Sequence, residues 1–207
     1  MTRWTRRIAQ LYLGLILYGL SMALMVRAGL GLDPWNVLHQ GIALGVHRAI
    51  GTVSIGIGVL VLLLWIPLRQ RPGLGTISNV FVVGLVQDQV LELISDQHGL
   101  GRQIPMLVGA ILLCGLATGM YISADLGPGP RDGLMTGLSA RLGWSIRLTR
   151  TLIEATVLVT GWLLGGSVGI GTVLFALGIG PLAQFFLRLL RIPPVPVVAE
   201  PAPVAAH

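Results

Sequence analysis

Long apolar runs separated by short polar stretches are the main pattern of this chain. A helix needs about 20 mostly apolar residues to cross a bilayer. Runs of about this length cover residues 8–28, 50–68, 74–95, 104–124, 147–165 and 171–190. The pattern therefore predicts an all-α, polytopic membrane protein: a helix bundle with six transmembrane helices.

Two shorter segments, residues 33–47 and 129–143, interrupt this series of long runs. Each carries a proline near its start (Pro34, Pro130), where proline suits the first turn of a helix. Both are too short to span a bilayer comfortably. We interpret them as half-helices that are either re-entrant, entering and leaving the membrane on one side, or interfacial. The alternative is a pair of amphipathic helices lying on the membrane surface.

The chain also repeats itself. Residues 11–94 align without a gap with residues 107–190 at a constant offset of 96, giving 21 identities in 84 pairs. The identities cluster at glycine, proline and threonine, as in the pairs Leu30-Gly31-x-x-Pro34 with Leu126-Gly127-x-x-Pro130, and Gly73-x-Gly75-Thr76 with Gly169-x-Gly171-Thr172. We therefore expect two membrane repeats, residues 1–98 and 99–191, followed by a disordered, Pro-rich cytoplasmic tail, residues 192–207.

Composition supports the membrane assignment, and charge gives it an orientation. Only 11% of the residues are charged, whereas soluble domains carry about 25%. All 14 basic residues are arginines, and most flank apolar runs, so we expect a lipid bilayer and no nucleic acid as partner. With six spans and cytoplasmic termini, 11 arginines lie inside and three (Arg27, Arg48, Arg102) outside. The positive-inside rule thus favours a bacterial plasma-membrane protein with both termini in the cytoplasm.

Three spans per repeat have a topological consequence. An odd number makes the second repeat enter the membrane from the opposite side, which predicts a 3+3 inverted repeat about an axis in the membrane plane. The half-helices then face opposite sides of the membrane. Several transporter folds are built in this way.

The half-helices contain the best candidates for a binding site. Asn36 aligns with Asp132 and Gln40 aligns with Thr136, and His39 adds a polar group in the first copy. Opposed helix N-termini carry partial positive charge and free N–H groups, so the pair could hold an anionic or zwitterionic solute. The alternative is that Asn36 and Asp132 only cap or solvate their own helices.

A second set of polar residues lies within the long runs, where polar groups are costly. Asp88, its repeat equivalent Gln184, and Glu154 are candidates for lining a path or coupling transport to an ion. Two structural alternatives remain open. Asp88 could lie in the solvated end of its helix, and Glu154 could pair with Arg150 one turn earlier.

The motifs of enzymes and metal sites are missing from the sequence. There is one cysteine, Cys114, and there is no His-Glu-x-x-His or Gly-x-Ser-x-Gly motif. We expect no catalytic residues, cofactor or metal site. Gly115-x-x-x-Gly119 is the small-residue motif of helix dimers, which is compatible with a homodimer.

The favoured function is a small-solute transporter or permease for an unidentified solute. The alternatives are an accessory or scaffold protein of a larger assembly and, third, a membrane-embedded enzyme.

One part of the sequence points to a family. The string Gly29-Leu-Gly-Leu-Asp-Pro-Trp-Asn-Val-Leu-His-Gln-Gly41 and the later Arg71-Pro-Gly-Leu-Gly-Thr76 resemble the YczE/YyaS/YitT-type family of bacterial integral membrane proteins. The second copy departs from this pattern, because Arg131 and Asp132 replace Trp35 and Asn36. The resemblance implies a small polytopic bacterial membrane protein from a largely uncharacterised family, without catalytic residues to carry over.

Overall fold

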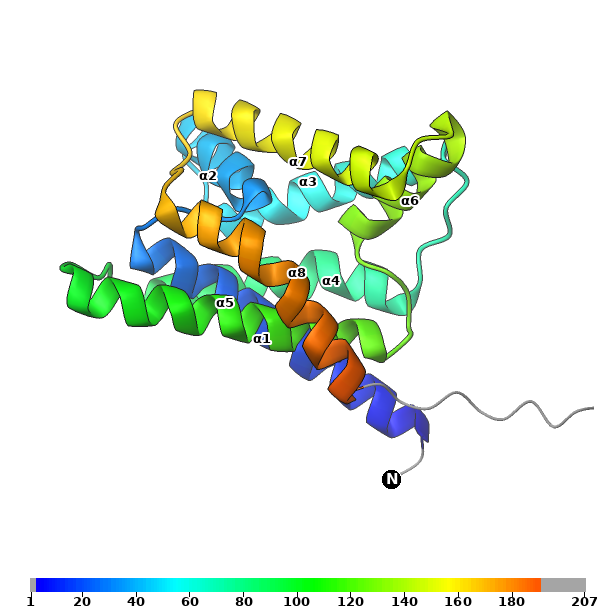
Figure 1. The fold of residues 1–207 in the computed structure, drawn as a ribbon, viewed down its shortest axis with the longest axis horizontal. Helices are drawn as coiled ribbons and strands as arrows, with labels where there is room; N and C mark the ends of the chain where they lie inside the picture. Colours follow the sequence, from blue (N-terminus) through cyan, green and yellow to red (C-terminus); the bar gives the residue numbers. More distant parts are fainter. Residues whose placement is uncertain (1–2, 191–207) are drawn as a thin grey trace, which may run out of the picture.

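The chain folds into a bundle of helices. The computed structural model describes residues 3–190, so the tail predicted from residue 192 onward lies outside the described residues. All regular structure within residues 3–190 is helical (Figure 1): α1 (Arg3–Ala28), α2 (Pro34–Val46), α3 (Ile50–Trp65), α4 (Leu74–Leu93), α5 (Leu100–Ser123), α6 (Pro130–Leu142), α7 (Ile146–Leu163) and α8 (Ile170–Leu190). The prediction of an all-α fold is confirmed.

The helix bounds follow the 96-residue offset of the sequence. Shifting α2 by 96 residues gives both bounds of α6, and α3 and α4 begin 96 residues before α7 and α8. The helices therefore form two sets of four, α1–α4 and α5–α8. Figure 1 shows α1 and α5 lying side by side and running in opposite directions, with α2 and α6 at opposite ends of the molecule.

Contacts between the two sets are reciprocal. The backbone N–H of Gly75 donates to the carbonyl of Leu126 over 2.7 Å. The equivalent N–H of Gly171 donates to the carbonyl of Leu30 over 2.8 Å. At the level of helices, α2 packs on α7 and α3 packs on α6. Equivalent residues and helices of the two sets thus make matching contacts with the other set.

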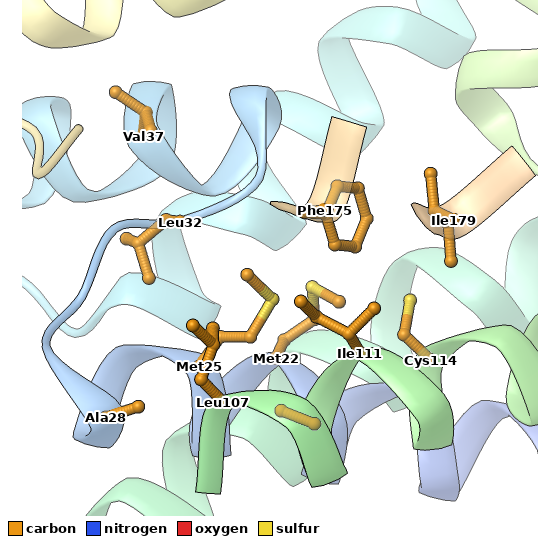
Figure 2. Close-up of a cluster of buried hydrophobic side chains, with 11 residues drawn as sticks. Met22, Met25, Ala28, Leu32, Val37, Leu107, Ile111, Cys114, Phe175 and Ile179 are labelled. Carbon is orange, nitrogen blue, oxygen red and sulfur yellow. The ribbon is translucent and has the colours of Figure 1, made fainter. Parts of the chain in front are cut away.

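The largest apolar core lies between the long helices and reaches α2. It contains Met22 and Met25 from α1, Leu107 and Ile111 from α5, and Phe175 from α8 (Figure 2). Large apolar side chains are also exposed on the outer helices; Leu163, for example, is 75% exposed and Leu177 is 72% exposed. A soluble domain does not usually expose so much contiguous apolar surface, whereas lipid solvates it.

Four helices are long and apolar enough to cross a membrane: α1 from Trp4, α4, α5 and α8. The α2–α3 pair, bent by 112°, would make a fifth if it counts as one span. The prediction of six spans is thus supported for four of its helices. With 16 residues, α3 is about 24 Å long, short of the roughly 30 Å hydrocarbon core. Within its 18 residues, α7 carries Arg147, Arg150 and Glu154.

The two sets of helices differ in one packing contact. In the first set, α3 packs along α4. In the second set, the corresponding helices α7 and α8 make at most marginal contact. The helices are therefore packed together on the α3–α4 side and lie further apart on the α7–α8 side.

Candidate functional site

The two half-helices meet at their N-termini. Asp33 is the N-cap of α2, and its carboxylate accepts a hydrogen bond from the backbone N–H of Asn36. Arg131, the second residue of α6, places Nη1 3.5 Å from Oδ1 of Asp33. The same guanidinium lies 4.9 Å from the centre of the Trp35 ring. This ion pair joins the two repeats. Arg131 is partly exposed, and Asp33 is buried.

An amide network fixes α2 to α4. Asn36 is 1% exposed, and its Nδ2 donates to Oδ2 of Asp33 over 2.5 Å and also contacts the sulfur of Met22. Its Oδ1 accepts a hydrogen bond from Nε2 of Gln87, which is equally buried, over 3.0 Å. Buried polar groups in a membrane bundle need such partners, because lipid offers none.

Two further side chains of the site, His39 and Asp132, have polar atoms that can still accept a hydrogen bond or an ionic partner. His39 is 1% exposed, and its Nδ1 has no hydrogen-bond partner in the part of the chain that the structure describes. Asp132 accepts a hydrogen bond from the hydroxyl of Tyr121 over 3.1 Å. Its carboxylate has no arginine within 4.0 Å among residues 3–190.

We call these residues the central cluster. It consists of polar side chains walled by aromatic rings: Asp33, Asn36, His39, Gln87, Arg131 and Asp132, with Tyr18, Trp35 and Tyr121. Tyr18 and Tyr121 pack edge to face, with ring centres 6.0 Å apart.

A cavity lies on each side of the central cluster. The smaller, of about 80 Å³, lies toward α3 and α4, and the larger, of about 290 Å³, lies toward α7 and α8. Both are lined by Tyr18, Trp35, Tyr121, Arg131 and Asp132, so these five residues separate the cavities.

The outer walls of the two cavities are equivalent in the repeat. Seven residues of α3 and α4 line the smaller cavity, and for five of them the residue 96 positions later lines the larger one: Ser54 and Arg150, Ile57 and Ile153, Gly58 and Glu154, Asn79 and Phe175, and Val83 and Ile179. The larger cavity is wider because α7 and α8 are separated where α3 and α4 are packed. Much of the same wall is thus present twice, once around a narrow cavity and once around a wide one.

The residues predicted to bind a solute occupy two kinds of position. Asn36, His39 and Asp132 belong to the central cluster. Gln40 lies apart from both cavities, and its Oε1 accepts a hydrogen bond from the N–H of Ser167 in the loop before α8. Thr136 also lies apart and bonds within its own helix, to the carbonyl of Gly133.

The second predicted set is also divided. Asp88 accepts hydrogen bonds from the N–H of Gly51 over 2.6 Å and from the hydroxyl of Thr52 over 2.9 Å, so it caps the start of α3. Glu154 pairs with Arg150 over 2.8 Å, as its i,i+4 spacing suggested, and lines the larger cavity. Gln184 lines the same cavity.

Sequence reasoning gave no site role to Gln87 or Arg131. Gln87 continues the buried face of α4 formed by Thr76, Val80 and Val83, at the spacing of one helix face. This spacing could have separated it from its exposed neighbour Gln89. Arg131 was assigned to a cytoplasmic flank, because an arginine near a helix start resembles a charge at the membrane surface.

The helical fold, the spans and the exposed apolar surface define an integral membrane protein built as a helix bundle. The chain belongs to a family of unknown function (DUF6198), whose model matches residues 5–188. It is 43% identical over 198 residues to an uncharacterised protein of Haemophilus influenzae, covering 93% of this chain and 90% of that protein. The chain is also 32% identical over 189 residues to the uncharacterised membrane protein YczE of Bacillus subtilis, covering 89% and 85% of the two chains.

A third relative is the uncharacterised protein YyaS of Bacillus subtilis, 26% identical over 183 residues that cover 86% of this chain and 91% of that protein. Together these matches confirm the resemblance found in the Gly29–Gly41 and Arg71–Thr76 strings. No solved structure matches the chain with significance.

Proposed function

We propose that this protein is a small-solute transporter that binds its solute at the central cluster and works by alternating access. One observation carries the proposal: two cavities with equivalent walls meet at one buried polar cluster, and only one of them is wide. A scaffold protein has no need for a polar cluster reached by two such cavities, because a polar group away from water is costly wherever its hydrogen bonds or charge are not satisfied.

The membrane arrangement follows from the directions of the helices. The counterparts α1 and α5 run in opposite directions, and the half-helices lie at opposite ends (Figure 1). With the long helices along the membrane normal, this is a 3+3 inverted repeat in which α3 and α7 cross the membrane with the help of the half-helices. The arginine distribution places the end that holds the start of α1 and the end of α8 in the cytoplasm.

Transport then requires an exchange between the two repeats. In the structure, α7 and α8 are apart and α3 and α4 are packed. The repeat relation allows a second conformation in which α3 and α4 separate while α7 and α8 pack. The larger cavity contains Gln184 and Leu187 near the end of α8, so the present conformation opens toward the cytoplasm. The second would open to the other side.

Cysteine accessibility tests this exchange without knowledge of the solute. Cys114 is fully buried and is first replaced by alanine. Ile57→Cys and Ile153→Cys then place single thiols at equivalent positions in the smaller and the larger cavity. A membrane-impermeant thiol reagent should modify the Ile153→Cys thiol from the cytoplasmic side and the Ile57→Cys thiol, more slowly, from the opposite side.

A position outside the cavities controls for reagent access. Leu60 lies on the exposed, lipid-facing side of α3, so the reagent should label the Leu60→Cys thiol from neither side. Modification of the Ile57→Cys and Ile153→Cys thiols from the same side, or of neither, would contradict alternating access.

A further inference from the structure

The charges around the larger cavity do not cancel. Three carboxylates, of Asp33, Asp132 and Glu154, line it together with two guanidinium groups, of Arg131 and Arg150. Arg131 pairs with Asp33 and Arg150 pairs with Glu154. One negative charge remains, and it belongs to Asp132. A carboxylate that faces a cavity between packed helices is costly unless a positive charge or a proton balances it.

The half-helix N-termini do not need an anion from outside. The carboxylate of Asp33 already caps α2, and Asp132 stands in the first turn of α6. Carboxylates at these positions meet the partial positive charge of a helix start, which is about half a unit and offsets only part of the charge of Asp132. The expectation of a bound anion, which rested on free helix N-termini, therefore loses its physical basis.

The walls of the site suit a positive charge. Trp35, Tyr18 and Tyr121 line both cavities, and aromatic faces attract cations within about 6 Å of the ring centre. The chain provides an internal example, because the guanidinium of Arg131 lies 4.9 Å from the ring centre of Trp35. An aromatic wall next to an unbalanced carboxylate is the usual chemistry of organic-cation recognition.

His39 adds an independent observation. It lines the smaller cavity, it is 99% buried, and its Nδ1 has no hydrogen-bond partner among the described residues. A buried ring nitrogen left without a partner loses the full value of a hydrogen bond. Nδ1 is enclosed in this conformation, so His39 is an unsatisfied polar group beside the central cluster rather than a direct contact of a solute in the larger cavity.

We propose that the site takes a small organic cation with N–H donors, an amine or a guanidine, whose charge is balanced by Asp132 and whose body lies against Trp35, Tyr18 and Tyr121. This inference rests on the proposed function and names its substrate class. A metal ion is a poor alternative, since residues 3–190 contain no group of three or more His, Cys, Asp or Glu side chains placed to hold one.

The test compares two probes of equal length and opposite charge, butylammonium and butyrate, each radiolabelled and bound to the purified full-length protein in detergent. Butylammonium should bind saturably and butyrate should not. Asp132→Asn should weaken butylammonium binding at least about tenfold, which corresponds to about 1.4 kcal/mol. Asp132→Glu, which keeps the charge, should retain most of the affinity.

The matched control is Asp125→Asn. Asp125 is a neighbour in sequence, but its side chain is 81% exposed and pairs with Arg7 on the surface. This variant should bind butylammonium like the wild type. Preferential binding of butyrate, no butylammonium binding, or equal affinity in wild type and Asp132→Asn would overturn the cation inference.

The two proposals fail in different experiments. Butylammonium binding that depends on Asp132, without alternating labelling of the Ile57→Cys and Ile153→Cys thiols, would leave a cation-binding site and remove transport. Alternating labelling without cation binding would leave the transporter and remove the cation.

Discussion

At the scale of single residues, the hydrogen bond from Gln87 to Asn36 is the link between the site and α4. Gln87→Leu removes the donor and leaves the buried Oδ1 of Asn36 without it. Hydrogen bonds between membrane helices contribute about 0.6 kcal/mol on average and up to about 1.7. We expect a loss of about 1 kcal/mol, measured as a lower unfolding midpoint in detergent.

Gln89→Leu is the natural control for this substitution. Gln89 lies two residues away on the exposed side of α4, so the same change there should leave the midpoint nearly unchanged or raise it slightly. Equal effects of the two substitutions would mean that the Asn36–Gln87 bond adds nothing to stability.

The residue scale also shows what the sequence could and could not predict. Asn36 and Asp132 were found because they occupy equivalent positions in the two copies. Arg131 was missed because its partner, Asp33, lies 98 residues earlier, and only the meeting of two half-helices brings them together. Recurrence thus identifies positions, whereas the pairing of unlike residues across the axis depends on the fold.

At the scale of helices, the contact between α3 and α6 depends on the absence of a side chain at Gly133. A Cβ atom there would overlap the indole ring of Trp65, whose Nε1 donates to the carbonyl of Pro130 over 3.0 Å. Extra atoms in a packed interface typically cost about 1–3 kcal/mol. Gly133→Ala should therefore lower the unfolding midpoint in detergent.

Gly109→Ala provides the comparison, because a Cβ at Gly109 meets nothing within 4 Å. Alanine also favours a helix over glycine, so this variant should be neutral or slightly more stable. A Gly133→Ala variant as stable as Gly109→Ala would show that Trp65 moves without cost.

The helices were predicted unevenly, for local reasons. The bounds predicted for the half-helices, 33–47 and 129–143, lie within one residue of those of α2 and α6. Proline marks the start of each helix, so these starts could be located from the sequence. The end of α3 was predicted too late. Pro67 has no backbone N–H to continue the helical hydrogen-bond series, so α3 ends at Trp65 although Ile66 still has helical dihedral angles. Apolar residues continue past this point, so hydrophobicity alone could not find it.

At the scale of the whole molecule, the two sets of helices make some equivalent contacts and differ in one major contact. The reciprocal hydrogen bonds Gly75–Leu126 and Gly171–Leu30 keep the two halves related. The packing of α3 on α4, without a match between α7 and α8, breaks that relation. The alignment of the two halves predicted helices at equivalent positions, because both halves share the same glycines. The alignment could not predict that α3 packs on α4 while α7 and α8 stay apart, because two conformations of similar sequences align equally well.

The orientation of the whole bundle in the membrane gives the last prediction. The α3–α4 connection lies at the same end of the molecule as the start of α1, and the α4–α5 connection lies at the opposite end (Figure 1). A reporter fused after Arg71 should therefore be active as a cytoplasmic fusion, and one fused after Gly101 as a periplasmic fusion.

The arginines give this expected orientation its physical basis: Arg69 and Arg71 flank the first connection, and the positive-inside rule predicts that they stay in the cytoplasm. Replacing both by glutamine should weaken the bias and increase the share of misoriented Arg71 fusions. Two fusions on the same side would exclude α4 as a span and, with it, the inverted arrangement on which alternating access depends.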